Sequence, residues 1–100
     1  MRDPRQELQR LDLVVGRIVR ADVHPGSRAP SLLLTVDLGG RGERQASLPS
    51  PNYEAETLVG RQVVCALGGD EAVVVGVHSR SAGLVLLVPD RDVEDGTAVS

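Results

Sequence analysis

Residues 31–39 read SLLLTVDLG, and this stretch decides the fold class. Every second position is aliphatic, and these positions are Leu32, Leu34, Val36 and Leu38. The positions between them are Leu33, Thr35 and Asp37, so polarity alternates along most of the stretch. Alternation with a period of two is typical of a β-strand that buries one face. We therefore expect a strand over 31–39 with its even-numbered side chains in a core.

The sequence on both sides predicts further short strands, separated by turns rich in glycine and proline. Upstream, LVVGRIVRADV (13–23) predicts a long strand, and Gly16 within it indicates a bulge or a sharp bend. Downstream, we expect strands over 43–48, 61–67, 72–78 and 84–89. A helical turn over 53–58 falls between the third and fourth strands, as in the OB architecture. The sequence therefore predicts an all-β fold, a five-stranded OB-fold β-barrel with a short N-terminal helix and a C-terminal strand extension.

The N-terminal helix is predicted from Asp3-Pro4, because Asp caps helices and Pro is tolerated at the first helical position. The helix should reach about Leu11, with Leu8 and Leu11 on one side. A helix this short is unstable alone. We expect it to dock either on its own barrel or on a second subunit.

Length and composition limit the function classes. A chain of 100 residues predicts a single domain over 1–100. No apolar run approaches the roughly 18 residues that span a bilayer, and the segment MRDPRQELQR has no apolar region typical of a signal peptide. We therefore expect a cytoplasmic protein without a membrane partner. Only one residue, Tyr53, is aromatic, so platforms for stacking RNA bases are scarce.

The distribution of charge is uneven. The net charge of −3 argues against a general nucleic-acid binder, which is usually basic. All eleven basic residues are arginine, and eight of them lie in residues 1–50. Arginine forms bidentate contacts with phosphate, so a local arginine patch is compatible with RNA binding.

Catalysis and cofactor binding find no support in the sequence. The single cysteine, Cys65, lies in the apolar run VVCAL, which indicates a buried thiol rather than a reactive one. Two histidines without a carboxylate cluster give no metal site, and no nucleophile elbow or phosphate loop is present. We expect no catalytic residue, no metal and no cofactor, and hence a protein that is not an enzyme.

Three segments resemble one family. They are LDLVVGRIVRADVHPGSRAPSLLLTVDLG (11–39), YEAETLVGRQVV (53–64) and LVLLVPDRDVEDG (84–96). Their order and spacing resemble the CsaA-like tRNA-binding domains, a branch of the OB-fold domains. The resemblance implies a homodimer that binds tRNA, with the terminal extensions at the subunit interface. It also implies an export-related chaperone activity, with an unfolded or exported polypeptide as partner.

The chain departs from this family after the VVCAL strand. The family usually has a stretch rich in Lys and Arg there, whereas this chain reads GGDEAVVVGVHS (68–79). In one alignment Ala72 and Val73 replace the basic pair; in another, Asp70-Glu71 matches a Ser-Glu pair and the basic stretch is deleted. Both alignments remove cations and leave two acids nearby. Fewer phosphate contacts predict weaker or relocated RNA binding.

Six residues are the candidates for RNA binding, and they are Arg17, Arg28, Arg41, Arg44, Arg61 and Tyr53. The arginines either line one face of the barrel or form an ordinary solvated surface. Tyr53 either stacks on a base or, as the resemblance implies, anchors the short helix. The main hypothesis is tRNA binding through arginine; the alternative is a chaperone or export-related module that uses apolar positions such as Leu33 and Val85. A third hypothesis is a paralogue with neither activity.

Overall fold

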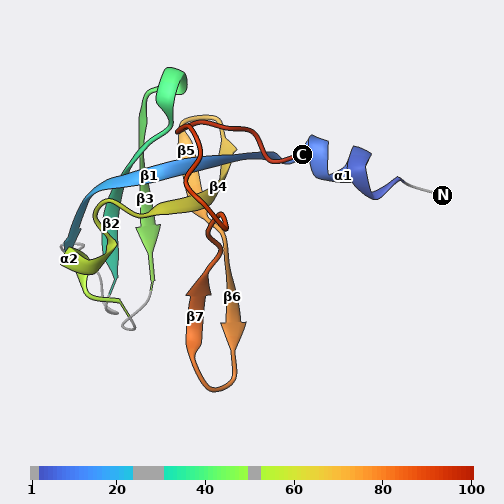
Figure 1. Ribbon diagram of the computed structural model, residues 1–100. Coiled ribbons are helices and arrows are strands. Elements are labelled where there is room, and N and C mark those ends of the chain that lie inside the picture. The colour runs from blue at the N-terminus through green and yellow to red at the C-terminus, as the bar shows by residue number, and fades with distance from the viewer. Residues whose placement is uncertain (1–2, 24–30, 50–52) are drawn as a thin grey trace.

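The computed structural model describes residues 3–23, 31–49 and 53–100. Five antiparallel strands form one sheet in the order β3-β2-β1-β4-β5 (Figure 1). They are β1 (Asp12–Val23), β2 (Leu32–Asp37), β3 (Glu43–Leu48), β4 (Gln62–Gly68) and β5 (Glu71–Val74). The edge strands β3 and β5 contact each other, so the sheet curls into a nearly closed barrel. Helix α2 (Ala55–Leu58) separates β3 from β4, and the predicted OB fold is confirmed.

The alternating stretch forms β2 and buries one face, as predicted. Its even-numbered residues Leu32, Leu34, Val36 and Leu38 are all buried, with exposures of 7% or less. They pack with Ile18 and Leu58 in an aliphatic core. Cys65 is fully buried in the same core, and burial raises the pKa of its thiol to about 11. The thiol is therefore a core residue and not a nucleophile.

Strand β1 pairs with both β2 and β4, which makes it the central strand of the barrel. The predicted bulge at Gly16 is wrong, because the register shift lies between Ile18 and Arg20. Gly16 instead permits close packing. A Cβ atom there would lie 2.4 Å from Val36 Cγ1 and 2.8 Å from Leu38 Cδ2.

The expected strand over 72–78 is two strands. Strand β5 ends at Val74, and β6 (Gly76–Ser79) pairs with β7 (Gly83–Leu86) in a separate hairpin. The change of partner occurs at Val75, whose N–H donates to Val64 O (2.9 Å) and whose carbonyl accepts from Leu87 N (3.0 Å). Figure 1 shows this hairpin extending away from the barrel.

Helix α1 (Pro4–Arg10) begins as predicted and ends one residue before Leu11. Asp3 caps it by accepting a hydrogen bond from Arg5 N (3.0 Å). None of its residues is buried, and it stands away from the barrel (Figure 1). It therefore does not dock on its own barrel. Among the described residues, no helix has the length and apolar character to cross a membrane.

The C-terminal strap, residues 90–99, follows β7 and forms an isolated antiparallel bridge between Ala98 and Val14 of β1. It pairs with the first half of β1 through Gly96 N to Val15 O (2.6 Å), Val15 N to Thr97 O (2.8 Å) and Val99 N to Leu13 O (2.9 Å). The turn into this pairing packs tightly on the short 3-10 helix η1 (Gly39–Arg41). A Cβ atom on Gly96 would lie 2.3 Å from Leu38 O.

Candidate nucleic-acid interface

Arg17 links the barrel to the C-terminal strap. Its Nη1 donates to Gly60 O (2.8 Å), its Nη2 lies 2.8 Å from Asp92 Oδ2, and its Nε lies 3.3 Å from Asp95 Oδ1. The hydrogen bond to Asp92 is the main cause that raises the pKa of Arg17. Arg17 therefore carries a charge that two strap carboxylates already compensate.

Arg61 lies at the entry to β4 and follows Gly60, whose carbonyl accepts the hydrogen bond from Arg17. It lines a groove of about 280 Å³ between the start of β4 and the strap. The groove is lined by Gly60, Arg61, Gln62, Val88, Pro89, Asp90, Arg91 and Asp92. No ion pair or side-chain hydrogen bond holds the Arg61 guanidinium within the described part of the chain. Its charge is free to meet an anion.

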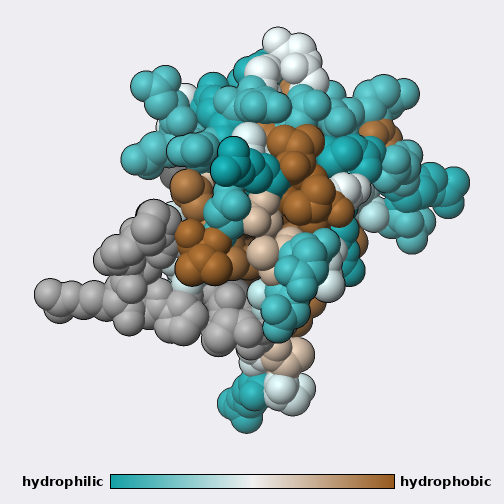
Figure 2. All heavy atoms as spheres, turned by 90° about the vertical axis from the view of Figure 1, so that its left-hand side faces the viewer, coloured by the Kyte–Doolittle hydropathy of each residue, from teal (hydrophilic) through white to brown (hydrophobic). Residues whose placement is uncertain are grey.

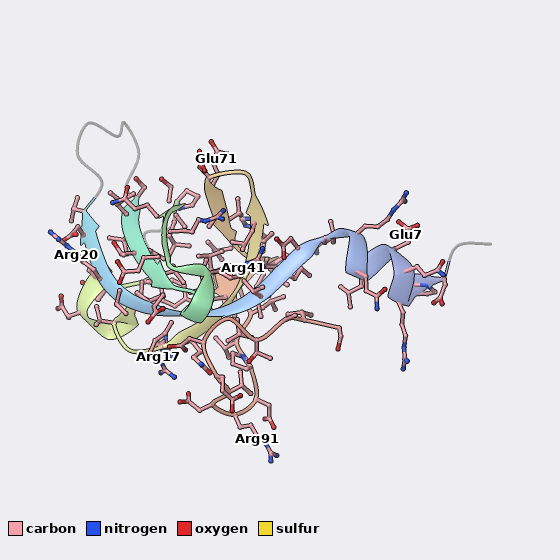
Figure 3. All side chains as sticks on the ribbon, turned by 90° about the horizontal axis from the view of Figure 1, so that it is seen from above. Glu7, Arg17, Arg20, Arg41, Glu71 and Arg91 are labelled. Carbon is pink, nitrogen blue, oxygen red and sulfur yellow. The ribbon has the colours of Figure 1, made fainter. Side chains whose placement is uncertain are left out.

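Arg91 is a second accessible cation of this groove. Its side chain is 85% exposed, and its contact with Asp90 is long, at 3.6 Å. Figure 3 places Arg91 and Arg17 on the same side of the barrel and Glu71 on the opposite side. The sequence analysis missed Arg91 because its neighbours made the segment look simply acidic. The nearby Pro89, which ends the last apolar run, was the only local signal.

Arg41 and Arg44 make contacts within the fold. Arg41 donates two hydrogen bonds to Asp12, of 2.8 and 2.7 Å, and these lower the pKa of the Asp12 carboxyl. The pair ties η1 to the start of β1. Arg44 reaches from β3 to the backbone carbonyls of Gly69 and Glu71, so it bridges the seam between β3 and β5. Both side chains thus hold elements of the barrel together.

Tyr53 packs against the core, and its hydroxyl accepts a hydrogen bond from Leu86 N (3.1 Å). This contact joins the segment before α2 to strand β7, as an anchoring residue would. Arg28, the remaining candidate, lies outside the described residues. The five candidates that the structure describes do not form one cluster, and Arg17 reaches the backbone next to Arg61 through the Gly60 carbonyl.

A second groove crosses the outer face of β1, β2 and β3. Arg20, Thr35 and Gln45 are cross-strand neighbours there and line about 520 Å³. Arg20, also missed from sequence, is paired with Asp22 at 2.7 Å, and Glu43 lines the same groove. Figure 2 shows hydrophilic side chains surrounding a smaller hydrophobic group on one side of the molecule. Arg44 also lines this groove, and both of its arginines already have partners in the fold, whereas Arg61 has none among the described residues.

The described residues contain no group of three or more His, Cys, Asp or Glu side chains placed to hold a metal ion. The turn between β4 and β5 carries Asp70, and Glu71 begins β5, so both acids of the altered family stretch lie at this end of the barrel.

Comparison with known proteins gives two sets of relatives. Methionine–tRNA ligase of Methanothrix thermoacetophila is 35% identical over 104 residues, which cover 96% of this chain and 15% of the ligase. The ligase of Methanopyrus kandleri is 38% identical over 86 residues, or 86% of this chain and 12% of that protein. The chain thus spans less than a sixth of these relatives. No protein-family model matches it.

The solved structures give matches of full length. The chaperone CsaA of Bacillus anthracis superposes with a TM-score of 0.87 at 26% identity, and the alignment covers all of both chains. This chain therefore resembles CsaA over its whole length. CsaA from Picrophilus torridus shares the fold as well, with a TM-score of 0.87 at 20% identity over 99% of this chain and all of that one. The chain thus combines the barrel fold of these CsaA structures with a groove between the start of β4 and the strap.

Proposed function

We propose that residues 1–100 form a non-catalytic tRNA-binding domain. The observation that carries this proposal is the match of nearly the whole chain, at 35% identity, to a segment of an enzyme named for its tRNA substrate. An OB barrel supports it further, because OB folds present a strand surface and loops to oligonucleotides. A tRNA ligand places the proposed activity in the cytoplasm.

The proposed RNA surface is the groove that contains Arg61. Phosphate contacts supply most of the affinity for nucleic acid, and they require cations that the fold leaves accessible. Arg61 meets this requirement, and Arg17 donates to the carbonyl of the preceding Gly60. The guanidinium groups of Arg41 and Arg44 lie near the surface but are already bonded to Asp12 and to the Gly69 carbonyl. Because carboxylates of the strap border the groove and few cations are accessible, we expect a modest affinity and a shallow salt slope.

The proposal includes a homodimer, which would pair two modest RNA sites and raise their combined affinity. Its support is the apolar surface that the described residues leave uncovered. Val77 and Val85 face each other across the β6–β7 hairpin and are 50% and 36% exposed. Leu11, next to the undocked helix α1, is 58% exposed. A second copy covering these residues would bury them and give α1 a partner.

A second candidate function is binding of an unfolded or exported polypeptide. The same exposed residues of the β6–β7 hairpin favour it, and the full-length structural match named a chaperone supports it. An aggregation assay with a chemically unfolded client tests this function. Suppression at a stoichiometric ratio would support it, and unchanged aggregation would exclude it.

Filter binding of labelled tRNA over a salt series tests the main proposal. We expect retention at low salt and a linear fall of log K with log salt concentration. Arg61→Gln should weaken binding several-fold and reduce the magnitude of the salt slope by about one. Arg80→Gln is the matched control, because Arg80 is an exposed arginine in the distant β6–β7 turn. Absence of tRNA retention by the unaltered protein at low salt would refute the proposal.

A further inference from the structure

In the ion pair between Asp92 and Arg17, the carboxylate is far more exposed to solvent than the guanidinium. The carboxylate lies 2.8 Å from Nη2 of Arg17, yet the Asp92 side chain is 76% exposed whereas that of Arg17 is 28% exposed. The carboxylate therefore approaches the guanidinium from the solvent side, at the wall of the groove that also contains Arg61 and Arg91. An external anion reaching Arg17 would approach along this side and meet Asp92.

The attachment of the strap does not depend on Asp92. Gln62 is buried and holds the strap by three hydrogen bonds: Nε2 to Val93 O (2.6 Å), Nε2 to Asp95 Oδ1 (2.8 Å) and Val93 N to Oε1 (3.0 Å). Asp95 also contacts Nε of Arg17. The backbone pairing with β1 adds further bonds. Asp92 can therefore leave Arg17 while the strap stays in place.

A phosphodiester group has the chemistry to take the position of Asp92. Like a carboxylate, it offers charged oxygens that accept the parallel N–H groups of a guanidinium. A phosphate that displaced Asp92 would gain Nη2 of Arg17, and it would do so beside Arg61, which lines the groove with Asp92. Arg91 lines the same groove and adds a third cation.

We infer that this groove is a phosphate site for the RNA backbone and that Asp92 occupies it in the free protein as a built-in competitor. The inference rests on the proposed tRNA-binding function and adds its regulation. RNA must displace the carboxylate from Arg17, so the acidic strap lowers affinity and admits only ligands that supply several phosphates at once. Free inorganic phosphate has the same chemistry but supplies one contact at a time.

The test compares tRNA affinity of the full chain with Asp92→Asn, Asp92→Ala and Glu94→Gln. Glu94→Gln is the matched control: it removes one negative charge from the same strap, and the Glu94 side chain has no partner among the residues that the structure describes. Loss of this exposed ion pair should raise the affinity of both Asp92 variants by up to about fivefold, beyond the gain of Glu94→Gln. The alanine variant also removes the hydrogen bond that asparagine retains.

A double-mutant cycle assigns the effect to Arg17. In an Arg17→Gln background, Asp92→Ala should no longer raise affinity beyond the control. Equal gains from Asp92→Ala and Glu94→Gln would overturn the inference while leaving tRNA binding intact. Absence of tRNA binding by every variant would refute both the inference and the proposed function. A separate titration with inorganic phosphate distinguishes the sources, because tight binding of phosphate alone would contradict a site that needs an RNA backbone.

Discussion

Carboxylates in contact with individual arginines decide whether each guanidinium can also bind a phosphate. Arg41 and Asp12 form a bidentate pair that ties η1 to β1, and Arg17 bridges the strap and the barrel. Guanidinium groups meet carboxylates and phosphates with the same geometry. The sequence could therefore indicate arginines suited to RNA, but it could not show that Arg41 and Arg44 are engaged in the fold. Long-range pairs such as Arg41–Asp12 leave no local signal.

The Asp12 carboxyl predicts an acid-dependent loss of stability. Its pKa is lowered below 3.8, chiefly by the hydrogen bond from Arg41, so its contribution is present above pH 3.8 and is lost as pH falls through the lowered value. Asp12→Asn should therefore destabilise the protein in urea unfolding at pH 7, and the difference from the unaltered protein should shrink in strong acid. Asp70→Asn, at an exposed turn, is the control. A difference that stays constant with pH would contradict this role.

Gly16 predicts a packing defect when it is substituted. Gly16→Ala places a methyl group 2.4 Å from Val36 Cγ1, inside the core of the barrel. Overpacking of this kind costs about 1–3 kcal/mol, which urea unfolding measures directly. Gly40→Ala is the control, since no atom lies within 4 Å of its added Cβ. Equal stability of the two variants would contradict the packing role of Gly16.

At the scale of elements, alternation predicted β2 well because only one of its faces is buried. The run AVVVGVH (72–78) is apolar on nearly every residue, so periodicity could not reveal that the chain changes partner at Val75. Gly16 predicted a bulge in β1, but its missing side chain instead makes room for Val36 and Leu38 to pack closely against β1. A glycine in a strand indicates either a bulge or a close approach of another strand, and only the tertiary contacts show which of the two is present.

The β6–β7 hairpin and helix α1 carry the prediction of a dimer. Val77→Ser combined with Val85→Ser should shift the protein from dimer to monomer in light scattering, because both side chains are exposed on one hairpin. Val59→Ser is the matched control, as Val59 is 48% exposed at the end of α2. The hairpin variant should keep its fold, since neither valine lies in the barrel core. A monomeric unaltered protein at micromolar concentration would contradict the dimer.

The whole molecule is acidic, with a net charge of −3, and it leaves few cations accessible. The barrel is retained although the family's basic stretch is absent and aromatic residues are nearly absent. Affinity for RNA then rests on a small groove bordered by the acidic strap, and so few phosphate contacts predict a shallow dependence of affinity on salt. The similarity to relatives predicts the fold more strongly than it predicts which residues contact RNA.

Backbone amide NMR during a tRNA titration tests the central claim most directly. The groove account predicts that the largest shift changes fall on residues 60–62 and 90–93, at the start of β4 and on the strap. Resonances of the β6–β7 hairpin, residues 76–86, should change little. Changes confined to that hairpin, or to the outer face of β1, β2 and β3, would contradict the account.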